Sequence, residues 1–412
     1  MNVIKLFQQN VYVKEWDAVI VRVTKIDENT AGIYLDQTAF FPEGGGQSCD
    51  TGTITSPDVS MDVIDVQEDG LQIIHTVRIS SGNFPDSGVS VHCRLDWGRR
   101  FDNMQRHCGE HILSGICHSL FGGINRGFHM GHDAMTIDIS LEENPQITEI
   151  TYAMAMVAEL EANKVIWADS PVTVMRFDSR EEAENLPLRK ALAFDEDISI
   201  VCVGSPENAS DCVACCGTHP STAGQVGIIK IFKVEKYKGM FRIFFEAGQR
   251  ALEACRLRHD ILYKLSNRYS SSIEDFPSKL RSSEAKMAET KAKLHRITAA
   301  LIAKESAELD EKAASSNDNV IIHRLKVLSM DDVFNMSKTY MGNTPKLLLL
   351  YSEEDTSFIL VSSGTPSCGK LVKEYASFYN GKGGGNDLSA RAIFTSEEDA
   401  MLFADLVVKH LK

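Results

Sequence analysis

Alternating apolar and polar residues dominate the first part of the chain. From Trp16 to Cys93 the sequence consists of short alternating runs, such as AVIVRV at 18–23 and GIYL at 32–35, separated by Gly, Asp and Asn. A two-residue period is typical of strands with one buried face, and the separating residues favour turns. We therefore predict a β-barrel-like domain at residues 1–93.

The next part mixes helical and strand-like periods. Between residues 99 and 120 the positions 104, 107, 108, 111, 112 and 115 recur at helical spacing, after Asp102 and Asn103 as candidate N-caps. A second helix is predicted at 147–163, and strands are predicted at 135–139, 172–177, 198–203, 227–234 and 241–245. These elements predict an α+β domain at residues 94–250.

A long helical segment follows. Leu280, Met287, Leu294 and Leu301 recur every seven residues, but the intervening seam positions at 283, 290, 297 and 304 hold Ser, Thr, Ile and Lys. Because only one seam position is regularly apolar, the pattern favours a helical hairpin or arm packed on the rest of the chain over a two-stranded coiled coil. We assign this arm to residues 251–316.

The last part has the pattern of a separate α/β domain. A small, polar linker at 313–319 precedes the order strand, helix, strand, strand, helix, strand, helix. Its strands include 320–322, 346–350 and 358–361, and the domain is assigned to residues 317–412. The fold class expected for the whole chain is therefore α+β in four parts.

Composition and charge limit the possible partners. The chain has 412 residues, of which 43% are hydrophobic, and no apolar run approaches the ~20 residues that cross a bilayer, so we expect a soluble, cytoplasmic protein without a membrane partner. A net charge of −14 disfavours contact with nucleic acid. The charge is segregated, however, because residues 250–304 carry twelve Lys and Arg against six Asp and Glu.

Cysteine usage points to metal or catalytic chemistry. Ten cysteines without a secretory signal argue against a disulfide framework, since reducing compartments keep thiols free. Five of them lie toward the middle of the chain, at positions 202, 212, 215, 216 and 255.

Two pairs of ligand-type residues share one spacing. His107 and His111 lie four residues apart, which on a helix directs both imidazoles to the same side. Cys215 and His219 repeat that spacing in a turn-like segment, and together the pairs supply the four N and S ligands that tetrahedral zinc prefers. The residues alone leave Cys108, Cys212 and Cys216 open as alternative thiol ligands.

The order of these motifs resembles a known family. His107, His111, Cys215 and His219 are similar to the zinc signature of alanyl-tRNA synthetase editing domains and their freestanding relatives, the AlaX proteins. FFPEGGGQ at 40–47, followed by DTG at 50–52, resembles the glycine-rich loop of that family's barrel domain. GKGGG at 381–385 resembles the glycine-rich loop of the C-terminal domain that these synthetases share with DHH-type phosphoesterases. The long form of AlaX fits best.

The resemblance implies a function. The protein would deacylate tRNA for alanine that carries serine or glycine, in trans, as a zinc-dependent hydrolase. The four residues of the two pairs would be the zinc ligands, and the residues expected at the amino-acid pocket are Gly44, Gly45, Gly46, Gln47, Phe128, His129 and Gly131. An ordinary turn before a strand is the alternative interpretation of 127–131. The family often has a threonine just before the second histidine for serine recognition, and this chain has Glu110 there.

Further residues are assigned provisional roles. Glu110 is a candidate general base beside the metal, unless it simply faces solvent. Gly381, Lys382, Gly383 and Gly384 do not form a Walker A element and are candidates for holding RNA phosphates, the alternative being a flexible turn. The helical arm and the C-terminal domain are the segments expected to join two copies if the protein is a homodimer.

Two other functions compete with editing. HCGEH at 107–111 also fits the H-x-x-E-H pattern of metallopeptidases, in which a later carboxylate completes the metal site. Alternatively, the four ligands hold together a non-catalytic, zinc-stabilised RNA-binding module.

Overall fold

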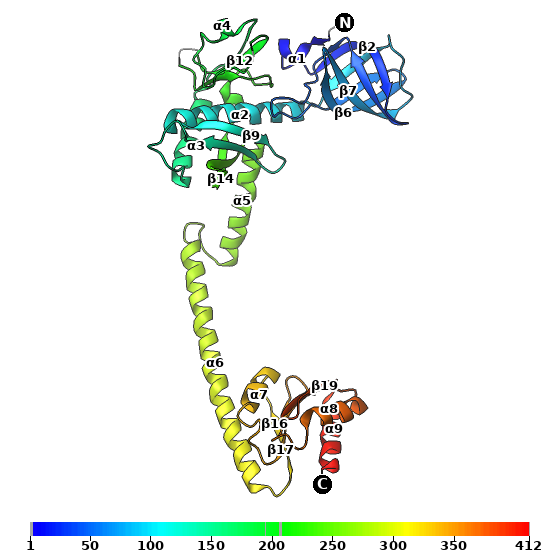
Figure 1. Cartoon of the computed structure of the whole chain (residues 1–412), viewed down its shortest axis with the longest axis vertical. Helices are drawn as coiled ribbons and strands as arrows, with labels where there is room; N and C mark the ends of the chain where they lie inside the picture. Colours follow the sequence, from blue (N-terminus) through cyan, green and yellow to red (C-terminus); the bar gives the residue numbers. More distant parts are fainter. Residues whose placement is uncertain (1–2, 194, 206–207, 412) are drawn as a thin grey trace. The chain divides into compact units, whose positions relative to one another are not determined.

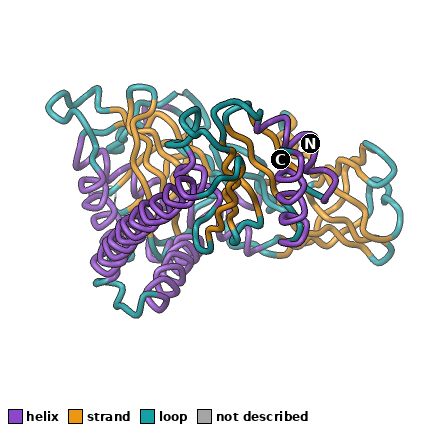
Figure 2. The backbone as a smooth tube through the Cα atoms, turned by 90° about the horizontal axis from the view of Figure 1, so that it is seen from below, coloured by secondary structure: helices purple, strands orange, loops and turns teal. Residues whose placement is uncertain are grey.

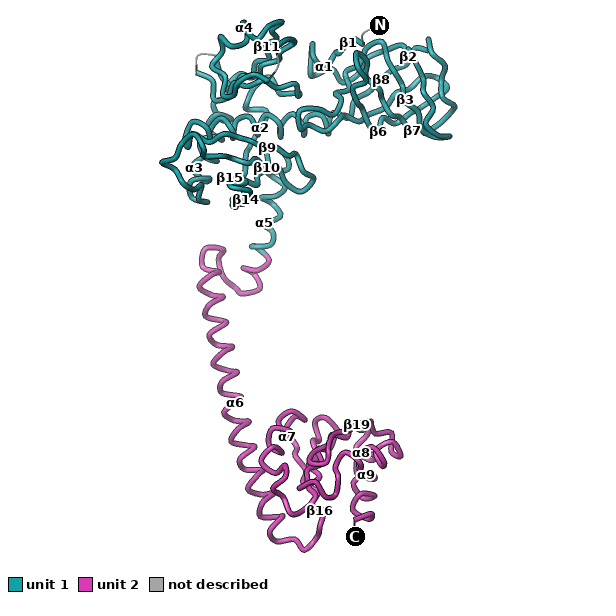
Figure 3. The backbone as a smooth tube through the Cα atoms, viewed as in Figure 1, with its two compact units in different colours: residues 1–263 teal, residues 264–412 magenta. Residues whose placement is uncertain are grey.

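A computed structural model describes residues 3–193, 195–205 and 208–411 of the chain (Figure 1). The chain divides into two compact units, residues 1–263 and 264–412 (Figure 3). The mixed α+β class is confirmed, whereas the four-part division with boundaries at 93, 250 and 316 stays a prediction. None of the helices in the described ranges is long and apolar enough to cross a membrane.

The first unit begins with a closed six-stranded barrel, as the alternating pattern predicted. Its strands pair in the order β2-β3-β7-β6-β5-β8. Their bounds are β2 (Glu15–Lys25), β3 (Thr30–Leu35), β5 (Gly52–Ser56), β6 (Val59–Asp69), β7 (Gln72–Ser81) and β8 (Ser90–Leu95). Alternate residues such as Ile20, Ile33 and Ile54 are fully buried in its interior. The short elements β1 (Ile4–Lys5), α1 (Leu6–Gln9) and β4 (Gln37–Thr38) complete this part.

Helix α2 (Trp97–Phe121) follows the last strand of the barrel. It begins before the predicted caps, because the side chain of Asp96 accepts a hydrogen bond from the Arg99 N–H. The expectation of Asp102 and Asn103 as caps is wrong, since both lie inside the helix. Arg100 of α2 is completely buried and pairs with Asp50 of the barrel, which fixes the start of the helix.

The rest of the first unit consists of two sheets. The four-stranded sheet has the order β14-β15-β10-β9, and α2 and α3 contribute to its apolar core; a three-stranded sheet has the order β11-β12-β13. The bounds are β9 (Ile124–Met130), β10 (Met135–Ser140), α3 (Tyr152–Trp167), β11 (Val172–Phe177), α4 (Arg180–Ala183), β12 (Ile198–Val203), β13 (Asp211–Ala214), η2 (Ala223–Val226), β14 (Ile229–Tyr237) and β15 (Met240–Ala247).

Two local expectations in this region are corrected. Residues 127–130, for which a turn was an alternative, belong to strand β9, whose pairing with β10 supplies backbone hydrogen bonds. Helix α3 begins five residues later than predicted, because the Thr151 side chain caps it by accepting from the Met154 N–H.

Two long helices follow the first unit's sheets. They are α5 (Gly248–Arg268) and α6 (Phe276–Ser315), and α6 is one uninterrupted helix (Figure 2). Helix α6 therefore includes residues 313–315, which were predicted to be linker. Leu309 near its end is buried in the core of the second unit, whereas Met287 and Leu294 of the seven-residue stripe are 70% and 63% exposed. A helical arm packed through that stripe stays a prediction.

The second unit contains a five-stranded sheet in the order β16-β17-β18-β20-β19. Its elements are β16 (Val320–Leu325), α7 (Met330–Ser337), β17 (Leu347–Ser352), β18 (Ser357–Val361), α8 (Cys368–Tyr375), η3 (Ala376–Tyr379), β19 (Lys382–Gly385), β20 (Ser389–Ile393) and α9 (Glu397–His410). Helices α8 and α9 share one core with the sheet, and α6 and α7 share the other.

Residues 382–385 of the glycine-rich segment form the edge strand β19, so both predicted forms, a loop and a flexible turn, are wrong for these residues. A Cβ atom at Gly383 would lie 1.9 Å from the Arg391 carbonyl oxygen of the neighbouring strand, and one at Gly385 would lie 2.2 Å from that of Ser389. Close backbone approach therefore explains these two glycines.

Candidate metal centre

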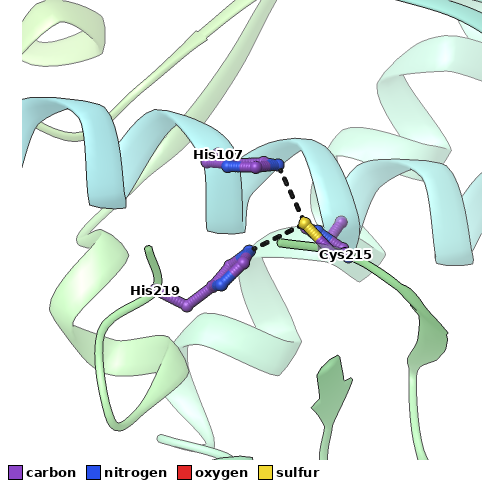
Figure 4. Close-up of side chains that lie close together, drawn as sticks. His107, Cys215 and His219 are labelled. Atoms are coloured by element: carbon purple, nitrogen blue, oxygen red, sulfur yellow. Dashed lines mark hydrogen bonds between the residues drawn. The ribbon is translucent and has the colours of Figure 1, made fainter. Parts of the chain in front are cut away.

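The structure brings the two predicted ligand pairs together. His107 and His111 project from one side of α2, and Cys215 and His219 lie in the loop after β13, residues 215–222, which we call the metal loop. One ligand atom from each of these four residues, which we call the ligand group, lies within 4.8 Å of all the others. The Cys215 Sγ is 3.4 Å from His107 Nε2 and 3.8 Å from His219 Nε2 (Figure 4). All three histidines are at most 3% exposed.

The donor atoms fit a metal ion. The Nε2 of His111 is buried and has no hydrogen-bond partner among the described residues, which is costly unless something else binds it. Burial raises the pKa of the Cys215 thiol, but the charges of His107, His219 and His111 outweigh burial and hold it well below its usual value. A thiolate among three imidazoles matches the ligand set of tetrahedral zinc.

Gln47 of the barrel orients His107. Its side chain is fully buried, and its Oε1 accepts hydrogen bonds from His107 Nδ1 at 3.1 Å and from the Thr218 N–H at 3.0 Å. Its Nε2 donates to Thr218 Oγ1 at 2.8 Å. With its proton on Nδ1, His107 presents Nε2 to the ligand group. Gln47 was expected at the amino-acid pocket. In the structure both ends of its amide form hydrogen bonds with Thr218 of the metal loop.

Asp211 orients His111 in the same way. The two side chains meet at 2.9 Å between Asp211 Oδ2 and His111 Nδ1, and Arg189 donates to both carboxylate oxygens. Burial would raise the pKa of Asp211, but its hydrogen bond to His111 and the charge of Arg189 hold it below the usual range. Asp211 and Arg189 could not be recognised from the sequence, because His111 lies 100 residues before Asp211 and no local motif links the three residues.

The other candidate thiols lie outside the ligand group. Cys212 is bonded to Cys202 across β12 and β13, so the expectation that the thiols are all free is wrong for this pair. Cys108 is completely buried, which raises its pKa far above the usual value. Cys216 is exposed at the surface. Of the open choices, Cys215 is the thiol that joins the histidines.

The glycine-rich loop of the barrel lies against the metal loop. Gly45 and Gly46 have positive φ angles of 59° and 81°, and Gly44 pairs with Gln47 in a tight turn. A Cβ atom at Gly45 would lie 3.0 Å from Cys216 Sγ, and one at Gly46 would lie 2.9 Å from the Phe128 ring. Side chains at these positions would therefore close the space beside the ligands.

The predicted pocket residues of β9 differ in position. Phe128 stacks on His107 with ring centroids 5.7 Å apart and an interplanar angle of 22°. His129 is exposed and, as the next residue of the strand, points to the opposite face. Gly131 follows the strand, and its carbonyl oxygen accepts a hydrogen bond from Arg106. The structure therefore brings Phe128 to the ligands and directs His129 away from them.

Glu110 does not face solvent, so that alternative is wrong. It is 6% exposed, and its Oε1 accepts hydrogen bonds from Ser114 Oγ at 2.6 Å and Asn125 Nδ2 at 2.7 Å. It is not one of the grouped ligands. The metallopeptidase interpretation needs a carboxylate ligand, and the donors that accompany the two histidines are a thiol and a third imidazole.

Comparisons with known proteins found relatives of this chain among the tRNA synthetases. A family model described as tRNA synthetases class II (A) matches residues 6–99. The chain is 29% identical over 421 residues to the alanine–tRNA ligase of Ignicoccus hospitalis, covering 98% of this chain and 43% of that protein. The C-Ala domain of Aquifex aeolicus alanyl-tRNA synthetase aligns with 23% of this chain and 93% of that chain, at 14% identity and a TM-score of 0.21, a likeness too weak to define the fold.

The barrel, the buried ligand group and the likeness to the ligase from Ignicoccus hospitalis point to the alanyl-tRNA editing class. The chain is 32% identical over 397 residues to the alanyl-tRNA editing protein AlaX-L of Pyrococcus horikoshii, covering 94% of this chain and 93% of that protein. The chain belongs to the AlaX-L family of alanyl-tRNA editing proteins. It spans less than half the length of the ligase from Ignicoccus hospitalis.

The contact of Asp211 with His111 leads to a prediction about metal affinity. Asp211→Asn should weaken zinc binding by about 10- to 100-fold, because the amide orients His111 less strongly and lowers its basicity. Competition with a chromophoric chelator measures this affinity. Asp138→Asn is the matched control, since Asp138 pairs with Arg242 and contacts no ligand. Equal affinity of the wild type and Asp211→Asn would contradict the orienting role.

Proposed function

We propose that this protein hydrolyses the aminoacyl ester of tRNA for alanine that carries serine, with glycine as a second substrate, and that His107, His111, Cys215 and His219 hold a zinc ion. The observation that carries the proposal is the buried ligand group with its unpartnered His111 nitrogen, in a chain of the AlaX-L family. Gly44, Gly45 and Gly46 then form the amino-acid pocket with Phe128.

The residues around the ligands suit a small acyl group. Gly45 and Gly46 leave room beside Cys216 and Phe128 that larger residues would fill. A synthetase pocket for alanine barely excludes serine or glycine, so a second site that hydrolyses the wrong ester improves fidelity. In the reaction, water adds to the ester carbonyl, the carbon–oxygen bond to the ribose breaks, and free amino acid leaves. Bound zinc supplies positive charge for the oxyanion that develops at that carbonyl.

Ester hydrolysis with charged tRNA tests the proposal. Purified protein should remove serine from tRNA for alanine rapidly and leave the correct alanyl ester intact. A His107→Ala, Cys215→Ala double variant should be slower by at least about 100-fold, since the charge that stabilises the oxyanion is lost.

Release of labelled amino acid measures both rates, and glycyl-tRNA tests the second substrate. Loss of neither ester from folded, zinc-loaded protein would contradict the proposal and favour the non-catalytic RNA-binding module. Equal loss of seryl and alanyl esters would contradict the selectivity alone.

We also propose that the edge of the second unit's sheet binds RNA phosphates. Lys382, Gly384 and Arg391 lie on one face of the paired strands β19 and β20. There, Gly384 and Arg391 border a cavity of about 570 Å³ with Phe334 and Met330 of α7. Of the predicted RNA-binding residues, Gly381 is buried and a Cβ atom at Gly383 would meet the backbone of β20, whereas Lys382 and Gly384 are exposed, so these two support the role better.

A charge-removing variant tests this contact. Lys382→Ala with Arg391→Ala should raise the KM for tRNA several-fold and leave kcat unchanged, because phosphate contacts contribute to binding and not to the chemical step. Steady-state deacylation at two salt concentrations measures both constants, with Lys409→Ala as the control. An unchanged KM and salt dependence would contradict RNA binding at this edge.

A further inference from the structure

Glu110 differs from the other buried acidic residues. In the described part of the chain, five acidic side chains are buried: Asp50, Glu110, Asp138, Asp211 and Glu246. Four of them form ion pairs with an arginine. No ion pair within 4.0 Å involves Glu110 in the described residues. A buried charge without an ion pair is costly. A buried carboxylate of this kind is therefore suited to bind a cation that comes from outside the chain.

The hydrogen bonds of Glu110 leave one oxygen available. Both donors, Ser114 Oγ and Asn125 Nδ2, bind Oε1, and these two donors are themselves 2.9 Å apart. Oε2 accepts no hydrogen bond within the described ranges. It is not fully enclosed by protein atoms either, so it retains access to solvent. The carboxylate is therefore fixed at one oxygen and open at the other.

Glu110 lies beside the metal centre. His107, Glu110, His111 and Ser114 have the spacing i, i+3, i+4 and i+7, which puts them on one side of α2. Asn125 belongs to β9, three residues before the Phe128 ring that stacks on His107. Glu110 is thus held between the ligand group and the strand that contributes the pocket wall.

Arg189 and His111, whose pKa the charge of Glu110 also raises, are both paired with Asp211, which leaves Lys190 as the internal partner to consider. It is half-buried, and burial together with the charge of Arg189 lowers its pKa, whereas Glu110 acts in the opposite direction. Burial thus disfavours the charged form of Lys190 that a permanent counter-ion would need. In addition, the ammonium of Lys190 does not lie within ion-pair distance of the Glu110 carboxylate.

We infer that Glu110 binds the α-ammonium group of the aminoacyl ester. This inference rests on the proposed function, because every aminoacyl-tRNA carries a free ammonium group next to the carbonyl that is hydrolysed. The free Oε2 would accept a charge-assisted hydrogen bond from that ammonium, and the substrate would supply the cation that no described residue places within ion-pair distance of Glu110. Glu110 then selects free aminoacyl esters and sets their orientation at the ligand group.

The comparison of two esters separates this role from general-base catalysis. Seryl-tRNA has the ammonium group, and N-acetylseryl-tRNA has a neutral amide in its place. The wild type should prefer the seryl ester by at least about tenfold in kcat/KM, the usual effect of one charge-assisted hydrogen bond. Glu110→Gln keeps an oxygen for Ser114 and Asn125 but loses the charge, so its activity on the seryl ester should fall about 10- to 100-fold and that on the acetylated ester should not change.

The remaining outcomes overturn the inference in distinguishable ways. If Glu110→Gln slows both esters by the same factor, Glu110 acts on the water or on the fold. If the wild type cleaves both esters equally well, the ammonium is not recognised, although the proposed function stands. If it cleaves neither, the proposed function itself fails.

Two further measurements keep the test independent of folding. Glu142→Gln makes the same change at an exposed acid and should alter neither rate, and zinc content should be equal in all variants. Binding of 3′-seryl-amido-3′-deoxyadenosine to the wild type by calorimetry needs no variant and no turnover. It should be at least about tenfold tighter than binding of its N-acetyl form, and equal affinities would overturn the inference.

Discussion

The three hydrogen bonds of the Gln47 side chain join the two parts from which the site is built. Gln47 comes from the barrel, whereas His107 and Thr218 come from α2 and the metal loop. Because the amide is fully buried, each lost bond would leave a polar atom unsatisfied. The close contact also explains Gly217, where a Cβ atom would lie 2.2 Å from His107 Cε1. The barrel loop, the ligand histidine and the metal loop therefore depend on one another.

The buried carboxylates of the first unit differ in whether an arginine pairs with them, and this difference indicates their roles. Asp211 is satisfied by His111 and Arg189, and Glu246 by Arg106, so these carboxylates hold the protein's own elements in position. Glu110 has hydrogen bonds but forms no ion pair within 4.0 Å in the described part of the chain, which is the arrangement expected of a group that meets a charged ligand. A site with both kinds of carboxylate can orient its ligands permanently and still recognise a transient cation.

Local patterns predicted much of the fold and the ligand set. The two-residue period found the barrel, the strands at 172–177 and 198–203 have the predicted bounds, and the repeated four-residue spacing found all four residues of the ligand group. Strands β9 and β19 were missed because their glycines resemble turns, although those of β19 allow close backbone approach. The contacts of Gln47 with His107 and of Asp211 with His111 could not be predicted, since only the tertiary fold brings these residues together.

The proposed function requires one metal centre at which the ester is hydrolysed, and zinc titration tests that requirement. Metal-free protein is refilled with measured amounts of zinc, and the rate of seryl-tRNA hydrolysis is followed at each step. The rate should rise in proportion to zinc and level off at about one ion per chain, as a single four-ligand site requires. Full activity in the metal-free protein, with its residual zinc measured, would contradict this requirement.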